Sequence, residues 1–109
     1  MTDLGKPPAW AFLSNHAHVL VCLDRDPDTT MREVAEQVGI TLRAVQGIVA
    51  HLVEEGYLVV ERHGRRNHYT LDRTRHLRHP LEQHSTVGDL LDALADPGRP
   101  RDRVHPCQG

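Results

Sequence analysis

Aromatic residues are scarce in this chain, which has one tryptophan, one phenylalanine and two tyrosines among 109 residues. Proteins that bind single-stranded nucleic acid stack the bases on aromatic side chains, so we expect no such platform. Apolar runs are also short: none is longer than the one at residues 19–23, which is far below the ~20 residues of a membrane-spanning helix. No charged and then apolar leader opens the sequence. We therefore expect a cytoplasmic protein without membrane contact.

Cysteine is equally rare. Cys22 lies in an apolar stretch with helical spacing, and Cys107 lies in a polar tail 85 positions further on. We expect no disulfide between them, which fits a reducing compartment.

The nine histidines raise the question of a metal site. The candidate ligands fall in a polar segment (His76, His79, Glu82 and His84) and in the tail (His105 and Cys107). Pro80 interrupts the first group, and neither group has the paired cysteines typical of zinc sites. We expect no metal and no cofactor, and keep a metal-responsive protein as an alternative.

Motifs of catalysis are missing as well. The sequence has no glycine-rich phosphate loop, no nucleophile elbow and no His–Glu helix motif. Glu54 and Glu55 adjoin on a predicted helix and so point about 100° apart, which prevents a close pair of carboxylates. We expect that the protein is not an enzyme.

Three helices are predicted in the first half of the chain. Ser14 is a candidate N-cap for the first, with Ala17, Leu20, Val21 and Leu23 at helical spacing. Thr30 and Glu33 match a capping box at the start of the second, which Gly39 ends. A third helix restarts at Thr41 and ends before Gly56. Two short helices joined by a tight glycine turn form a helix-turn-helix unit.

After Gly56 the apolar period changes from 3.6 to two, which predicts strands at 57–62 and 68–71 around a turn at 63–67. Thr86 and Asp89 then signal a final helix at 86–96. We divide the chain into an arm (1–13), a helical and hairpin domain (14–71), a connector (72–85), the final helix (86–96) and a disordered tail (97–109).

Positive charge is concentrated in one segment. Residues 62–79 hold six arginines against Asp72 alone, whereas the rest of the chain is net negative. A local concentration of basic residues is typical of a protein with an anionic partner. The alternative is a solvated arginine-rich loop.

Gly47 interrupts the third helix, although glycine costs roughly 1 kcal/mol relative to alanine in a helix interior. On a helical wheel Ile48, Val49, Leu52 and Val53 cluster around Val45, and Gly47 falls on the opposite side. The gap left by its missing side chain therefore faces outwards, where an external surface could approach.

This order of helices followed by an arginine-tipped hairpin resembles winged helix-turn-helix transcriptional regulators of the MarR/ArsR-like type. In that pattern Ala35 is the small residue where the helices cross, and Gly39 is the turn. The buried set is met by Val34, Val38, Ile40, Val45 and Ile48. The resemblance implies an α+β, mostly helical fold that binds double-stranded DNA, with helix 41–55 in the major groove and wing 62–67 on the minor groove or phosphates. The implied DNA-binding residues are Thr41, Leu42, Arg43, Gln46, Gly47, Ala50, Arg62, Arg65, Arg66 and Asn67. Arg43 and Gln46 are the expected base readers.

The final helix has a larger apolar face than so small a domain needs. We expect it to form a two-fold dimer with the N-terminal arm, through Trp10, Phe12, Leu13, Val87, Leu90, Leu91 and Leu94. The alternative is that it folds back onto its own domain. A dimeric repressor acting by occlusion on a pseudo-palindromic operator is the expected function. A winged helix that binds a protein rather than DNA is the main alternative, and the sequence indicates no effector.

Overall fold

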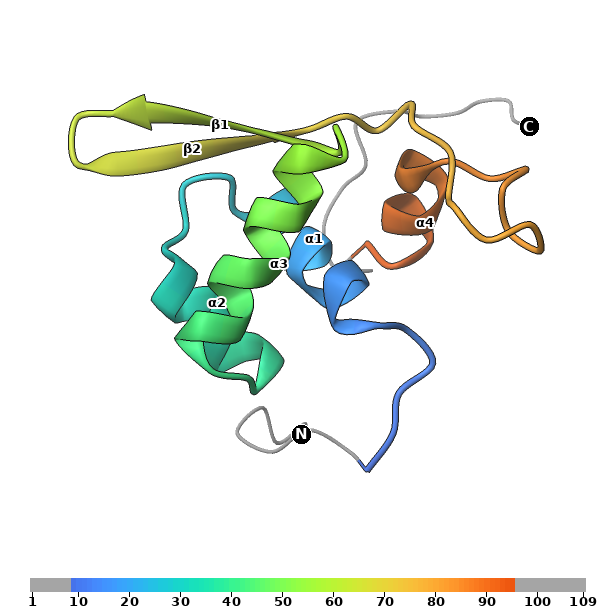
Figure 1. Cartoon of the computed structure of the whole chain (residues 1–109), viewed down its shortest axis with the longest axis horizontal. Coiled ribbons are helices and arrows are strands. Elements are labelled where there is room, and N and C mark those ends of the chain that lie inside the picture. The colour runs from blue at the N-terminus through green and yellow to red at the C-terminus, as the bar shows by residue number, and fades with distance from the viewer. Residues whose placement is uncertain (1–8, 96–109) are drawn as a thin grey trace.

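The computed structural model describes residues 9–95, which form four helices and one antiparallel hairpin (Figure 1). The elements follow in the order α1 (Asn15–Arg25), α2 (Met31–Val38), α3 (Leu42–Glu54), β1 (Leu58–His63), β2 (Arg66–Leu71) and α4 (Val87–Ala93). This is the predicted α+β winged helix-turn-helix fold, with a three-helix core and the hairpin as its wing. None of the helices in residues 9–95 is long and apolar enough to cross a membrane.

The helix starts follow the predicted capping residues. Ser14 Oγ accepts a hydrogen bond from the Ala17 N–H at 3.4 Å at the start of α1. Thr30 with Glu33 and Thr86 with Asp89 form complete capping boxes at α2 and α4. Gly39 ends α2 in the left-handed conformation at φ 86°, which glycine adopts without steric cost.

The core lies where the three helices meet the base of the wing. Its most buried side chains are Val19, Leu23, Val34, Val45, Leu58, Tyr69 and Val87. Val53 was predicted to join this core but is 42% exposed, because it stands at the edge of the α3 stripe. On α1 the predicted stripe missed Val19, which is fully buried, while Val21 is only partly covered.

The wing is longer than predicted, and its turn is tighter. Both strands reach a two-residue loop of Gly64 and Arg65, so the predicted turn at 63–67 is wrong in extent. Gly64 has a φ of 65°, whereas the non-glycine Arg65 has no positive φ. A glycine at the first central position alone is the pattern of a type II′ turn, which matches the twist of paired strands.

The final helix folds back onto its own domain. Val87 and Leu91 are 1% and 3% exposed within the single chain and pack into the core. The predicted use of these two side chains in a dimer interface is therefore wrong, whereas Leu90 and Leu94 stay partly exposed. The connector also has fixed structure, since His76 bridges Thr86 and the Val87 N–H donates to the Arg75 carbonyl at 2.8 Å. The predicted disordered tail at 97–109 lies outside the described residues.

Candidate nucleic-acid interface

Helix α3 presents an open outer face at Gly47. A β-carbon built at this position would have nothing within 4 Å outside its own helix and neighbours, and the residue is exposed. Val45, Val49 and Leu52 are buried on the other side. The predicted outward direction of Gly47 is therefore confirmed.

The polar residues around Gly47 are not engaged elsewhere. Arg43 and Gln46 are exposed, and within residues 9–95 neither has a hydrogen bond or an ion pair. A guanidinium and an amide with unused donors are the groups that read guanine and adenine edges in a major groove. Ala50 is also exposed and adds little bulk to this face.

The N-terminus of α3 holds the other two predicted residues. Thr41 is the N-cap, and its Oγ1 accepts a hydrogen bond from the Ala44 N–H at 3.0 Å. The hydroxyl proton stays available to donate to a phosphate oxygen, since a threonine hydroxyl is both donor and acceptor. Leu42 is half-buried and so contributes less to the outer face than the pattern implied.

The four predicted wing residues differ in what they can reach. Arg65 occupies the turn, is exposed and has no partner among residues 9–95. Arg62 is exposed as well, although its Nε donates to the Gly64 carbonyl at 3.0 Å and steadies the turn. Asn67 is half-buried, and its Nδ2 donates to the Tyr69 hydroxyl at 3.3 Å. The geometry gives Asn67 an inward, structural contact that the sequence did not indicate.

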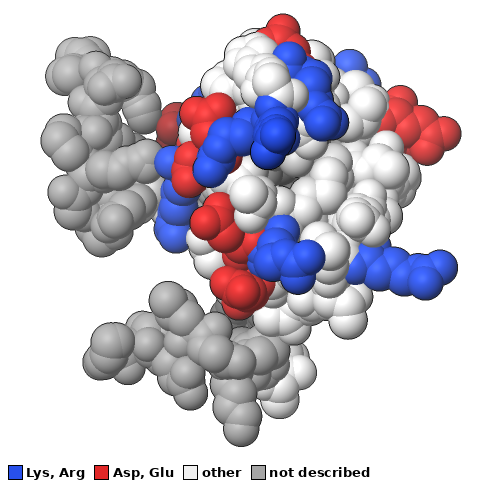
Figure 2. All heavy atoms as spheres, turned by 90° about the vertical axis from the view of Figure 1, so that its left-hand side faces the viewer, with Lys and Arg blue, Asp and Glu red and all other residues white. Residues whose placement is uncertain are grey.

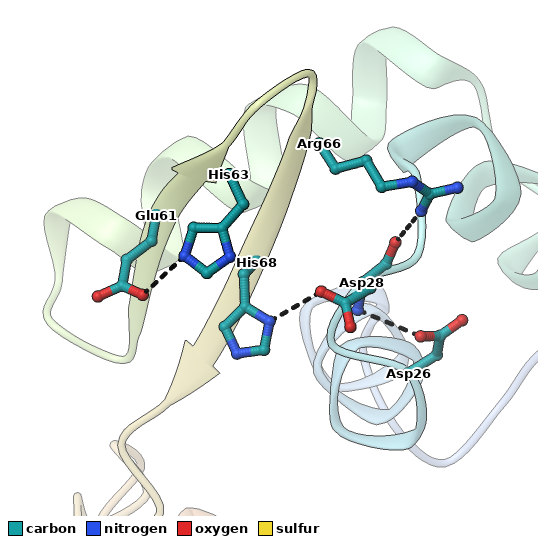
Figure 3. A network of polar contacts seen from close by, with 6 residues as sticks. All are labelled: Asp26, Asp28, Glu61, His63, Arg66 and His68. Atoms are coloured by element: carbon teal, nitrogen blue, oxygen red, sulfur yellow. Dashed lines mark hydrogen bonds and ion pairs between the residues drawn. The ribbon is translucent and has the colours of Figure 1, made fainter.

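Arg66 joins a polar network that holds the wing over the loop between α1 and α2 (Figure 3). Its Nη1 donates to the Asp28 carbonyl at 2.7 Å, and His68 Nδ1 donates to Asp28 Oδ1 at 2.8 Å. The imidazole of His63 stacks on that of His68, with ring centroids 5.5 Å apart. The hydrogen bond from His68, with the nearby positive charge, lowers the pKa of Asp28. This network fixes the position of the wing relative to the loop between α1 and α2.

The backbone reinforces the same attachment, because the Tyr69 N–H donates to the Pro27 carbonyl at 2.9 Å. Sequence reasoning missed Asp28 and His68 as positioning residues. Forty positions separate them, and neither belongs to a local motif that could have indicated the contact.

The arginine-rich segment does not form one basic patch. Arg73 bridges Asp24 and Asp92, and Arg78 pairs with Glu55, so these charges are neutralised locally. Arg75 lies over the Tyr57 ring, 5.2 Å from its centroid. The wing tip and α4 lie at opposite sides of the molecule (Figure 1). Of the six arginines in 62–79, the three of the wing are exposed, and none of them is ion-paired with a carboxylate in residues 9–95.

Figure 2 shows the side of the molecule that lies on the left of Figure 1. Basic side chains gather in the upper part of this face, and acidic side chains lie among and below them. An anionic partner would therefore meet a mixed surface in which the position of each cation matters more than net charge.

The predicted metal candidates are not brought together. Within residues 9–95, no group of three or more His, Cys, Asp or Glu side chains could hold a metal ion. His76 Nδ1 instead bonds to the Gln83 carbonyl, and His79 Nδ1 accepts from the Leu81 N–H. His105 and Cys107 lie outside the described residues.

Residues 15–59 match a family described as winged helix-turn-helix DNA-binding. The match covers α1, α2, all of α3 and the first residues of β1, and so includes every candidate on α3 but not the wing tip. No curated protein matches the chain. The comparison supports a DNA-binding winged helix-turn-helix, while the MarR/ArsR-like type stays a prediction because the matched description is broader.

Proposed function

We propose that the protein is a sequence-specific regulator that binds double-stranded DNA with α3 in the major groove. The open position of Gly47 carries this proposal, since it lets a surface approach the helix between Arg43 and Ala50. A B-DNA major groove is wide enough to admit such a helix. Arg43 and Gln46 then face the base edges, and the Thr41 hydroxyl meets a phosphate at the helix N-terminus.

Arg65, at the wing tip, contacts the adjacent minor groove or its phosphates in this arrangement. Arg62 lies one strand residue from the turn and assists Arg65 with its Nη groups, which have no partner within residues 9–95. The network around Asp28 holds the wing at a fixed place relative to α3, so both elements engage one duplex together.

The proposed regulator is a homodimeric repressor that occludes its operator. A two-fold dimer presents two copies of α3, so the operator is pseudo-palindromic with half-sites about one helical turn apart. Binding alone then blocks access to the site.

The test is selection of bound sequences from a random duplex pool, followed by titration of the enriched duplex. We expect Arg43→Ala to lose preference at particular positions, at about 1–3 kcal/mol per base contact. Arg25→Ala is the matched control, because Arg25 is an exposed arginine at the end of α1. An unenriched pool, or an Arg43→Ala variant with unchanged preference, would refute base readout.

The acidic side chains around the wing support a second candidate, a winged helix that binds a basic protein surface. Calorimetry at low salt separates the two. Absence of any heat of binding to duplex DNA, together with a protein that co-purifies in fixed proportion, would favour this candidate.

A further inference from the structure

A groove of about 500 Å³ opens on the surface where the N-terminal arm, α1, the end of α3, the connector and α4 meet. Its apolar lining includes Ala17 and Leu20 of α1, Leu52 of α3 and Leu90 of α4. The DNA-reading face of α3 takes no part, since Arg43, Gln46 and Gly47 do not line it.

Two large, exposed aromatic side chains lie at this groove: Phe12 lines it, and Trp10 contacts Phe12. Trp10 and Phe12 are 69% and 91% exposed, and their rings contact each other edge to face with centroids 4.9 Å apart. They are the only tryptophan and the only phenylalanine in the chain. Aromatic side chains dominate interface energetics when buried, so their exposure next to an apolar groove points to a partner that covers both.

The rim of the groove carries both signs of charge. His16 Nε2 and His51 Nδ1 are hydrogen bonded at 3.1 Å, and His51 lies 3.9 Å from the Glu55 carboxylate. Arg78 approaches the same carboxylate at 3.6 Å. A two-fold contact places one patch against itself, so the patch must be complementary to itself. The exposed aromatic pair and the groove are complementary in shape, and Arg78 and Glu55 provide both signs of charge at the rim.

We propose that the occupant is a second copy of this chain, with the aromatic arm of each protomer seated in the groove of the other. The inference deepens the proposed function, because it supplies the interface of the homodimer. A small molecule in the groove would meet Phe12, which lines it, but would leave Trp10 in water. The reciprocal contact buries both rings.

The area agrees with a stable dimer. A buried aromatic side chain covers about 150–250 Å². Because Trp10 and Phe12 are 69% and 91% exposed in the monomer, the four exchanged rings supply roughly 480–800 Å². The groove walls that they cover bring the total near the ~1,200–2,000 Å² of standard interfaces. Leu90, half-buried in the monomer, lies in this interface, while Val87 and Leu91 stay in the core of their own domain.

The same contact links the dimer to DNA binding. His51, Leu52 and Glu55 come from the last turns of α3 and its C-cap, so each arm touches the end of the partner's recognition helix. The interface thereby sets the relative orientation of the two helices that enter the operator.

Sedimentation equilibrium with tryptophan fluorescence on the full chain tests the proposal. Since Trp10 is the single tryptophan, its emission should shift to shorter wavelength with concentration, in step with the change from monomer to dimer mass. Phe12→Glu and Leu90→Lys should each abolish both changes while unfolding as cooperatively as wild type. Val59→Glu, which alters a 56% exposed valine on the wing, should change neither.

A monomeric wild type at all concentrations, or a dimer that persists in Phe12→Glu with unshifted Trp10 emission, would overturn the proposal. Titration of duplexes keeps this failure separate from failure of DNA binding. On a single half-site Phe12→Glu should bind like wild type, and on the full palindrome about a hundredfold more weakly. A monomeric wild type that still selects a sequence would overturn only the interface.

Discussion

His68 of β2 and Asp28 of the α1–α2 loop are joined by a 2.8 Å hydrogen bond between Nδ1 and Oδ1. Arg66 of the same strand donates to the Asp28 carbonyl, so one loop residue receives two wing side chains. The wing is otherwise only a two-stranded ribbon, and an isolated hairpin is marginal in water. Its attachment to the helices therefore decides where the arginine at its tip can reach.

The fold should lose stability in acid as the carboxylates of Asp28 and Glu33 become protonated. The pKa of Asp28 is lowered by the hydrogen bond from His68, and that of Glu33 by hydrogen bonds from the Thr30 N–H and the Thr29 hydroxyl. A carboxyl whose folded pKa is depressed stabilises the fold fully above its ordinary value, near about 4, and loses that effect as pH falls through the folded value. Urea unfolding midpoints should therefore drop below about pH 4.

The Asp28→Asn and Glu33→Gln variants should show a shallower acid dependence of these midpoints. Glu36→Gln is the matched control, because Glu36 is exposed on the same helix as Glu33 and has no partner among residues 9–95. If all three variants follow the wild-type curve, the Asp28 and Glu33 contacts do not contribute to stability.

Two substitutions at Gly47 should have separate effects, one on stability and the other on DNA binding. Gly47→Ala places a methyl group in open space, so the free energy of unfolding should rise by roughly 0.5–1 kcal/mol from helix propensity alone. Gly47→Glu should also fold, but its carboxylate would face the DNA phosphates and weaken duplex binding at least about tenfold, or 1.4 kcal/mol. Thermal unfolding and fluorescence anisotropy on the selected duplex measure the two effects. If Gly47→Glu and wild type bound the duplex with equal affinity, the duplex would not contact the outer face of α3 at Gly47.

The structural features that depend on residues close together in the sequence could be predicted from the sequence. A capping box needs two residues three positions apart, so Thr30 with Glu33 and Thr86 with Asp89 could be read directly. The direction of Gly47 followed from helical periodicity, because the buried stripe of Val45, Val49 and Leu52 fixes which side of α3 faces outwards. These features survive tertiary packing because packing on the buried face reinforces them.

Contacts between segments that are far apart in the sequence could not be predicted from such local patterns. The six arginines of 62–79 are neighbours in sequence, yet Arg73 bridges α1 and α4. Arg65, at the wing tip, has no partner in the described part of the chain. The fold-back of α4 depended on whether the core had room for Val87 and Leu91, which no local pattern encodes. Spatial neighbours, rather than charge density along the chain, decide which arginines can meet a ligand.

Arg73 should hold α4 against α1. Its guanidinium donates to Asp24 at 2.6 Å and to Asp92 at 2.7 Å, and the three side chains are 31–43% exposed. Arg73→Gln should lower the free energy of unfolding by about 1 kcal/mol, since partly exposed ion pairs are screened by solvent. Hydrogen exchange should quicken at the amides of α4 before those of α3. Arg43→Gln, an exposed arginine without a partner in residues 9–95, should leave both quantities unchanged.

Arg65 and Arg73 should differ in how their loss affects the salt dependence of DNA binding. A cation that neutralises a phosphate releases counterions, so the slope of log affinity against log salt should become shallower by about 1 in Arg65→Ala. Arg73 is neutralised by two aspartates away from the wing tip, so Arg73→Gln should keep the wild-type slope although it lowers stability. Titrations between 50 and 200 mM salt, about the range over which such affinities change most, give both slopes. Equal slopes for Arg65→Ala and wild type would mean that the wing tip touches no phosphate. A shallower slope in Arg73→Gln would mean that the ion-paired arginines also face the duplex.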